Sequence, residues 1–113
     1  MPHLSYTRQG SGPVLVLLHG YLGGSAMWAD QVAAFSSHRD VICPDLAGFG
    51  KSADLTAPDS ITGHALSVLQ LMDDLDVGAF ELLGHSMGGM VAQEVARLAA
   101  GRIRGATRRV DCV

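Results

Sequence analysis

The stretch GHSMGG, residues 84–89, places one serine among glycines between two segments of different character. The apolar run AFELL precedes it, and the segment MVAQEVARLAA, which has a helical period, follows it. In such a strand-to-helix setting, the G-x-S-x-G pattern presents a serine hydroxyl on a strained turn, and Gly84 and Gly88 let strand and helix approach closely. We therefore expect Ser86 to be a nucleophile. The alternative is an ordinary glycine-rich turn with a capping serine.

Upstream of Ser86, short apolar runs alternate with segments of helical period. The run VLVLL is bounded by Pro13 and Gly20, and its five consecutive apolar residues favour a strand covered on both faces, as in a parallel sheet. The alternation predicts an α/β fold with a mostly parallel sheet and helices on both of its faces. The predicted strands are residues 4–9, 14–18, 40–43 and 79–83.

Three helices are predicted from the same pattern. The first begins at about Ser25, the second has Ser60 as its N-cap, and the third follows Ser86. Each presents an apolar stripe that would face the sheet. The stripes are Trp28, Val32 and Phe35 in the first helix, Ile61, Ala65, Val68, Leu69, Met72 and Leu75 in the second, and Val91, Val95 and Leu98 in the third.

The composition favours a small globular protein. Of 113 residues 48% are hydrophobic, and the net charge of -3 gives no reason to expect binding to nucleic acid or to an anionic membrane. No apolar run approaches the roughly 20 residues that span a membrane, and MPHLSYTRQG lacks the apolar core of a signal peptide. Cys43 and Cys112 lack metal-ligand spacing. We expect a cytoplasmic protein with two reduced thiols and without a metal or cofactor.

The loop HGYLGG, residues 19–24, follows the most apolar predicted strand. The backbone amide of Tyr21 is the expected source of one donor to an oxyanion, and the amide of Met87 at the start of the third helix is the other. His19 is expected to hydrogen-bond its own loop into shape rather than to act in catalysis.

The loop DLAGFGKS, residues 45–52, contains the letters GKS after a predicted strand. A phosphate-binding loop needs glycine where this chain has Asp45, so that interpretation fails. We interpret the segment as a tight structural loop whose glycines bring it close to the site.

The segments HGYLGGSAMW, DLAGFGKS and GHSMGG, in this order and at these separations, resemble the N-terminal half of the α/β-hydrolase fold superfamily. The resemblance covers residues 4–100 and is strongest for small esterases, enol-lactonases and cofactor-free haloperoxidase-like perhydrolases. It implies that Ser86 attacks an acyl carbon while the amides of Tyr21 and Met87 stabilise the oxyanion. It also implies a histidine base, an orienting aspartate and a small-molecule ester or lactone as the substrate.

The base and the acid are not found where that superfamily has them, because its chain order is serine, acid, histidine. Neighbours in such a turn point away from each other, so His85 is not expected to be the base. His64 is expected to be a satisfied surface or boundary residue. The five histidines, all of which precede Ser86, are His3, His19, His38, His64 and His85.

The last 13 residues differ in character from the rest. Residues 101–113 carry 4 basic and 1 acidic group, whereas residues 1–100 carry 4 and 10. Their arginines interrupt any apolar run, so we expect no sheet strand there and do not assign Asp111 as the acid. The expected division is a partial α/β-hydrolase domain over 1–100, lacking its C-terminal strands, and a basic tail outside the family over 101–113. The strand at 79–83 would then form a sheet edge that favours self-association.

These observations favour a serine hydrolase of small carboxylic esters or lactones that acts through an acyl-enzyme, represented by a truncated chain without its acid and base. Two alternatives stay open. In the first, the chain is a catalytically inactive product of truncation or a frameshift. In the second, it is a non-catalytic relative that binds a ligand.

Overall fold

The computed structural model describes residues 3–111, with side chains over residues 3–104. Five strands form one sheet in the order β1-β3-β2-β4-β5. The strands are β1 (Tyr6–Gly10), β2 (Val14–Leu18), β3 (Asp40–Pro44), β4 (Phe80–His85) and β5 (Ile103–Asp111). The helices are η1 (Ser25–Trp28), α1 (Ala29–Phe35), η2 (Gly50–Ser52), α2 (Ile61–Asp74), α3 (Met87–Leu98) and η3 (Ala100–Arg102), of which the three η elements are short 3₁₀ helices.

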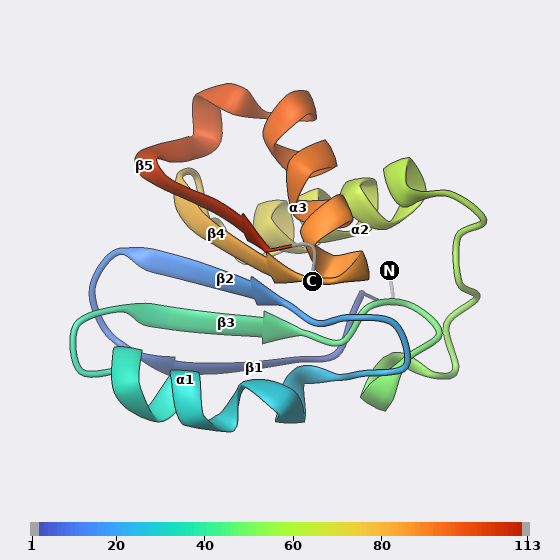
Figure 1. Cartoon of the computed structure of the whole chain (residues 1–113), viewed down its shortest axis with the longest axis horizontal. Helices are drawn as coiled ribbons and strands as arrows, with labels where there is room; N and C mark the ends of the chain where they lie inside the picture. The colour runs from blue at the N-terminus through green and yellow to red at the C-terminus, as the bar shows by residue number, and fades with distance from the viewer. Residues whose placement is uncertain (1–2, 112–113) are drawn as a thin grey trace.

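Only β1 runs antiparallel to its neighbour, β3, and the other pairs are parallel. Parallel neighbours need crossover connections, which α1, α2 and α3 provide. As Figure 1 shows, α1 lies on one side of the sheet, and α2 and α3 lie on the other. The carboxyl ends of β2, β3 and β4 therefore meet at one edge, where ligand sites of such sheets form.

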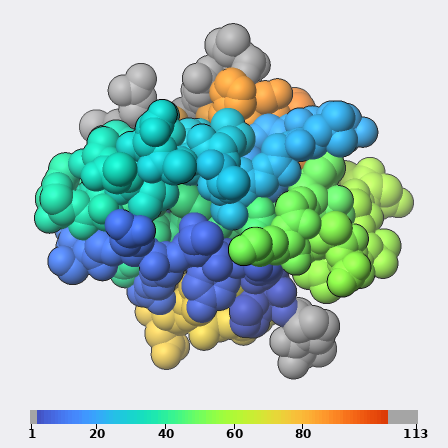
Figure 2. Space-filling model, turned by 90° about the horizontal axis from the view of Figure 1, so that it is seen from below, coloured from blue at the N-terminus to red at the C-terminus, as the bar shows by residue number. Residues whose placement is uncertain are grey.

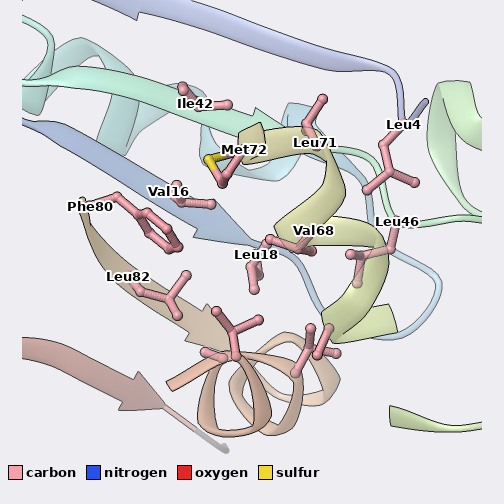
Figure 3. Packing of buried hydrophobic residues seen from close by; sticks show 14 of the residues in the cluster. Leu4, Val16, Leu18, Ile42, Leu46, Val68, Leu71, Met72, Phe80 and Leu82 are labelled. Carbon is pink, nitrogen blue, oxygen red and sulfur yellow. The ribbon is translucent and has the colours of Figure 1, made fainter. Parts of the chain in front are cut away.

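The sheet is buried on both faces, as the run VLVLL predicted. Val16 and Leu18 point toward α2 and α3, whereas Leu15 and Leu17 pack with Trp28 on the α1 side. The predicted stripe of α2 enters the larger cluster (Figure 3). The fully buried members of that cluster include Val16, Leu18, Ile42, Leu46, Val68, Leu71, Met72 and Phe80.

Local signals placed most of the helices correctly. Ser60 is the N-cap of α2, and its Oγ accepts a hydrogen bond of 3.0 Å from the amide of Gly63. The first helix begins at Ser25 as expected, but its first four residues are a 3₁₀ turn before α1. No helix within residues 3–111 combines the length and the apolar character that crossing a bilayer requires.

The expectation that residues 101–113 form no sheet strand is wrong. β5 pairs in parallel with β4, with Leu83 opposite Arg109 and His85 opposite Asp111. Arginines are costly in a strand that is buried between helices, but β5 lies at the edge of the sheet, where Arg104 is exposed. β4 is consequently an inner strand, and the edges of the described sheet are β1 and β5.

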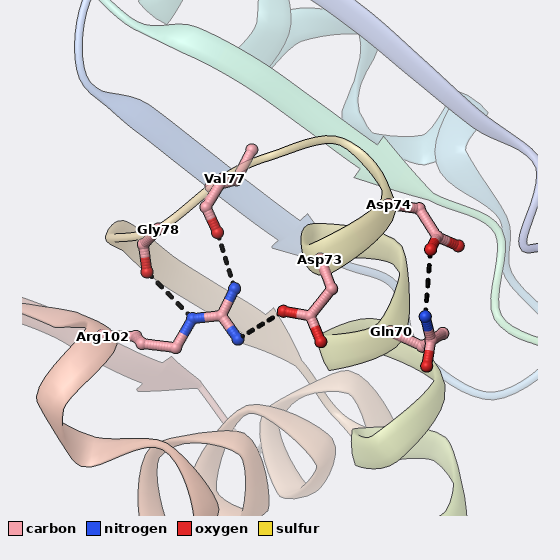
Figure 4. Close-up of polar contacts among 6 residues, drawn as sticks. All are labelled: Gln70, Asp73, Asp74, Val77, Gly78 and Arg102. Carbon is pink, nitrogen blue, oxygen red and sulfur yellow. Dashed lines mark hydrogen bonds and ion pairs between the residues drawn. The ribbon is translucent and has the colours of Figure 1, made fainter.

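Arg102 anchors the start of β5 to the rest of the fold (Figure 4). Its guanidinium donates to the carbonyls of Val77 and Gly78 at 2.6 and 2.9 Å, and to the Asp73 carboxylate at 2.8 Å. It also lies 5.7 Å from the centre of the Phe80 ring. This arginine of the basic segment therefore ties the segment before β4 to the segment before β5.

Candidate active site

Ser86 lies on the turn between β4 and α3, as the sequence predicted. Its backbone has φ 56° and ψ -120°, an unfavourable conformation for a residue with a side chain. Sheet pairing holds the residues before the turn, and the carbonyl of Ser86 accepts bonds from Gly89 and Met90 at the start of the helix. Neighbouring structure on both sides therefore keeps the strained serine in place. Its side chain is half-buried.

The glycines that flank Ser86 are required by the close approach of backbone segments. A Cβ on Gly84 would collide with the backbone of Gly88, and a Cβ on Gly88 would collide with the carbonyls of Leu18 and His19. The start of α3 thus packs directly onto the end of β2. This contact brings the turn and the loop after β2 to the same edge of the sheet.

The loop after β2 passes beside Ser86. A Cβ built on Gly20 would lie 3.1 Å from the Cβ of Ser86 and 3.2 Å from the carbonyl oxygen of His85. Tyr21 follows directly, and its amide donates no hydrogen bond to the backbone or side chains of residues 3–104. The amide of Met87, the first residue of α3, has no carbonyl within its own helix to bond. The two predicted donors therefore lie close to Ser86. One is in the loop after β2, and the other is at the start of α3.

His19 has the structural role that the sequence suggested. It is fully buried, its Nδ1 lies 2.8 Å from the carbonyl oxygen of Gly20, and its Nε2 accepts a bond of 2.9 Å from the amide of Leu46. Because Nε2 accepts, the ring is neutral and its proton is on Nδ1. With both nitrogens engaged, His19 has no free lone pair for a proton from Ser86.

The loop after β3 is the tight structural loop that was predicted. Its Asp45 is 2% exposed and bonds Ser25 across the gap between the two loops. Ser52, the last residue of the GKS segment, is also 2% exposed, and its Oγ accepts a bond of 2.8 Å from the amide of Ser5. The hydroxyl that a phosphate-binding loop would direct to a metal ion is used to hold the N-terminal segment.

The expectation for His64 is wrong. His64 is 5% exposed, and its Nδ1 has no hydrogen-bond partner among the described residues. Burial lowers the pKa of His64 below its ordinary value. The Phe49 ring, 6.3 Å away between centres, comes from a distant loop, so the helical period alone does not reveal that this position is covered.

His85 lies in a different environment from Ser86. It lines a hollow of about 430 Å³ on the α1 side of the sheet, together with Trp28, Phe35 and Leu83 among others. Within residues 3–104, no histidine nitrogen forms a hydrogen bond with the Ser86 hydroxyl. The described part of the chain thus brings the Ser86 turn, with Met87, next to the loop that carries Tyr21.

The comparisons with known proteins agree with this geometry. The family model described as alpha/beta hydrolase fold matches residues 13–108. A putative carbamate hydrolase, RutD, of Pseudomonas savastanoi pv. phaseolicola is 41% identical over 92 residues, which are 80% of this chain and 36% of that protein.

Among solved structures, the enol-lactonase of Burkholderia xenovorans LB400 superposes with a TM-score of 0.83 at 35% identity, covering 89% of this chain and 40% of that one. A thermophilic esterase of Thermogutta terrifontis gives 0.81 at 31% identity, with 88% and 37% covered. The chain thus spans well under half the length of these relatives. The family match, which covers most of the residues and includes the strained serine turn, places this chain in the α/β-hydrolase fold family.

Proposed function

We propose that the protein is a serine hydrolase of small carboxylic esters or lactones, in which Ser86 is the nucleophile. The observation that carries the proposal is the strained backbone of Ser86 at the β4–α3 turn, next to Gly20. Strain of this kind persists where surrounding structure imposes it, and it is concentrated at functional sites. The names of an enol-lactonase and an esterase among the similar structures support the substrate class.

The proposed chemistry is acyl transfer. The Oγ of Ser86 attacks the carbonyl carbon, its proton passes to a base, and the carbonyl oxygen takes up the negative charge. The backbone amides of Tyr21 and Met87 donate to that oxygen. Collapse of the adduct breaks the bond to the leaving oxygen, which departs as an alcohol or, in a lactone, stays attached as the ring opens. Water then releases the acid and frees Ser86.

In the proposed scheme, the base does not come from the described residues. His19 has both nitrogens engaged, His64 is buried, and no histidine follows Ser86 in the sequence. In the proposed scheme, a histidine and an acid from outside these residues complete the site. In this proposal, the chain contributes the nucleophile and the oxyanion donors to the site of the whole enzyme.

A labelling experiment with an added base tests the nucleophile directly. An alkyl fluorophosphonate is incubated with the purified chain, with and without imidazole, and the labelled peptide is identified by mass spectrometry. Attack by Ser86 breaks the phosphorus–fluorine bond, releases fluoride and transfers the proton to imidazole. We expect imidazole to accelerate labelling at Ser86. Ser86→Ala should abolish that label, and Ser37→Ala, at an exposed serine, should leave it unchanged.

The inactive alternative makes a different prediction for the same experiment. If the chain only keeps the fold, the fluorophosphonate should react no faster at Ser86 than at exposed serines such as Ser37, whatever the imidazole concentration. Equal labelling of these serines would contradict the proposed nucleophile.

A further inference from the structure

We propose that Asp45 is the positioning residue of the oxyanion loop, holding the segment His19–Ser25 so that the Tyr21 amide stays directed at the reaction centre. The inference rests on the proposed function for what the loop does, and on the contacts of Asp45 for how the loop is held.

Asp45 is a buried carboxylate, and among the described residues Ser25 donates both of the hydrogen bonds that it accepts. Its Oδ1 accepts a bond of 2.6 Å from the backbone amide of Ser25, and its Oδ2 accepts one of 3.2 Å from the Ser25 hydroxyl. Among the described residues no lysine, arginine or histidine forms an ion pair with it. Burying a carboxylate away from water is costly unless hydrogen bonds satisfy it, so the two bonds to Ser25 compensate its burial.

Two consecutive residues of the loop after β3, Asp45 and Leu46, hold the two ends of the oxyanion loop. Asp45 bonds Ser25 at the end of that loop, and the amide of the next residue, Leu46, bonds His19 at its start. Within the loop, the amide of Gly23 donates to the carbonyl of Gly20 at 3.0 Å and closes a turn around Tyr21. The segment that carries the Tyr21 amide is therefore fixed at its ends and across its middle.

Glycines on both loops make room for the carboxylate. A Cβ on Gly50 would collide with the Asp45 Oδ1, and a Cβ on Gly24 would lie 3.0 Å from the same atom. Figure 2 shows the light-blue segment after β2 next to the green segment after β3 on the surface. The Phe49 ring adds a contact with Tyr21, 5.5 Å between ring centres in an edge-on arrangement. This contact leaves Tyr21 67% exposed, so we assign the main restraint on the loop to Asp45.

Positioning matters because an amide stabilises an oxyanion only at hydrogen-bond distance. A displacement of about 1 Å, or loss of one donor, lowers rates by about 10²-fold in well-studied enzymes. Removing the carboxylate should release Ser25 and let the Tyr21 amide move, while the sheet and the Ser86 turn stay in place.

The test compares Asp45→Ala with Asp45→Asn in the full 113-residue chain. Asparagine keeps an oxygen that accepts from the Ser25 amide, and its nitrogen can donate to the Ser25 hydroxyl, so it should restore function. We expect imidazole-assisted fluorophosphonate labelling of Ser86 to fall by about tenfold or more in Asp45→Ala and to stay within about twofold of the parent in Asp45→Asn. Asp54→Ala, at an exposed aspartate, is the matched control.

Hydrogen exchange supplies a second readout that does not depend on reactivity. In Asp45→Ala the amide of Ser25 should lose protection, whereas amides of β2 should keep theirs. Gly24→Ala tests the same contact without removing the charge, since Gly24 is in extended backbone that alanine adopts freely and its Cβ would press on the Asp45 Oδ1. If Asp45→Ala does not fold, Gly24→Ala therefore tests the positioning role by itself. We expect Gly24→Ala to lose protection of the Ser25 amide and labelling of Ser86 in the same way.

The outcomes separate this inference from the proposed function. If the parent chain labels at Ser86 and a folded Asp45→Ala or Gly24→Ala chain labels equally fast, the positioning role is overturned. If the parent does not label, the proposed nucleophile fails instead. Hydrogen exchange then tests whether Asp45 holds the loop. A Ser25 amide that keeps its protection in both variants overturns that role.

Discussion

The α-carbon of Gly20 faces the side chain of Ser86 so closely that a Cβ at position 20 would lie 3.1 Å from the Cβ of the serine. That contact is tighter than ordinary van der Waals packing, and the nearby carbonyl of His85 limits movement on the same side. The loop after β2 and the Ser86 turn are thus fitted to each other through a glycine.

Gly20→Ala should therefore lower the reactivity of Ser86 more than it lowers stability. The added methyl pushes the loop away from the serine by a few tenths of an ångström and moves the Tyr21 amide with it. We expect imidazole-assisted labelling of Ser86 to fall severalfold while the unfolding midpoint in urea changes little. Gly101→Ala, at a position with no neighbour within 4 Å of the added atom, is the control. Unchanged labelling in a folded Gly20→Ala chain would count against the proposed arrangement.

Gly88→Ala should act on stability instead. Its Cβ would collide with the carbonyls of Leu18 and His19, which belong to the most buried strand and its loop and cannot move aside cheaply. Overpacking of this kind typically costs about 1–3 kcal/mol. The free energy of unfolding in urea, followed by the fluorescence of Trp28, the chain's single tryptophan, measures the loss. Gly78→Ala, in open space, should change it by less than about 1 kcal/mol.

Arg102 should be a strong contributor to the attachment of β5. Arg102→Ala removes the bonds to the two carbonyls and to Asp73 and leaves the Val77 carbonyl without the donor that Arg102 supplies. We expect a loss of about 1–3 kcal/mol in the free energy of unfolding. Arg102→Lys should recover only part of it, because an ammonium cannot reproduce the planar set of donors. Arg104→Ala offers a nearby exposed arginine for comparison.

His64 should make the stability depend on pH. Its pKa in the folded chain is lowered by burial, so the unfolded chain binds the proton more readily. The contribution of neutral His64 is thus fully present above the unfolded pKa, near 6.5, and is lost as the pH falls from there toward the folded pKa. In His64→Leu the fall in unfolding free energy between about pH 7 and pH 5 should be shallower than in the parent.

The chain has four further histidines, so the comparison needs a control. His38 is exposed, and His38→Leu should leave the slope of stability against pH unchanged. If His64→Leu and the parent lose stability in parallel, the burial of His64 is not the source of the dependence.

Periodicity and capping predicted those parts of the fold that depend on local sequence. The run VLVLL matches β2 residue for residue, because five consecutive apolar residues bounded by Pro13 and Gly20 favour a short strand covered on both faces. Ser60 was recognisable as a cap because its side chain bonds an amide three residues away. The turn at Ser86 could be predicted because strand, glycines and helix adjoin in the sequence.

Contacts between distant segments could not be predicted in the same way. β5 was missed because the arginine argument assumed burial on both faces, whereas an edge strand needs a backbone partner on one side only. The ring that packs near His64 is that of Phe49, which lies 15 residues earlier in a loop of irregular backbone. From the sequence, Asp45 was notable only as the residue that breaks the pattern of a phosphate-binding loop. Its bond to Ser25 joins two loops that are distant in the sequence, and no local pattern predicts that they lie side by side.

A polypeptide of these 113 residues should have negligible esterase turnover without an added base. Removal of the base from a serine–histidine–aspartate site typically lowers the catalytic constant by about 10⁴- to 10⁶-fold, and the residual rate comes from oxyanion donors and binding. We expect that no histidine before Ser86 replaces it, since both nitrogens of His19 are engaged and no described histidine bonds the Ser86 hydroxyl. Hydrolysis of a short-chain nitrophenyl ester by purified chain, with Ser86→Ala beside it, measures the rate. Turnover at rates ordinary for an esterase, lost in the alanine variant, would mean that a base exists within these residues and that the argument from chain order is wrong.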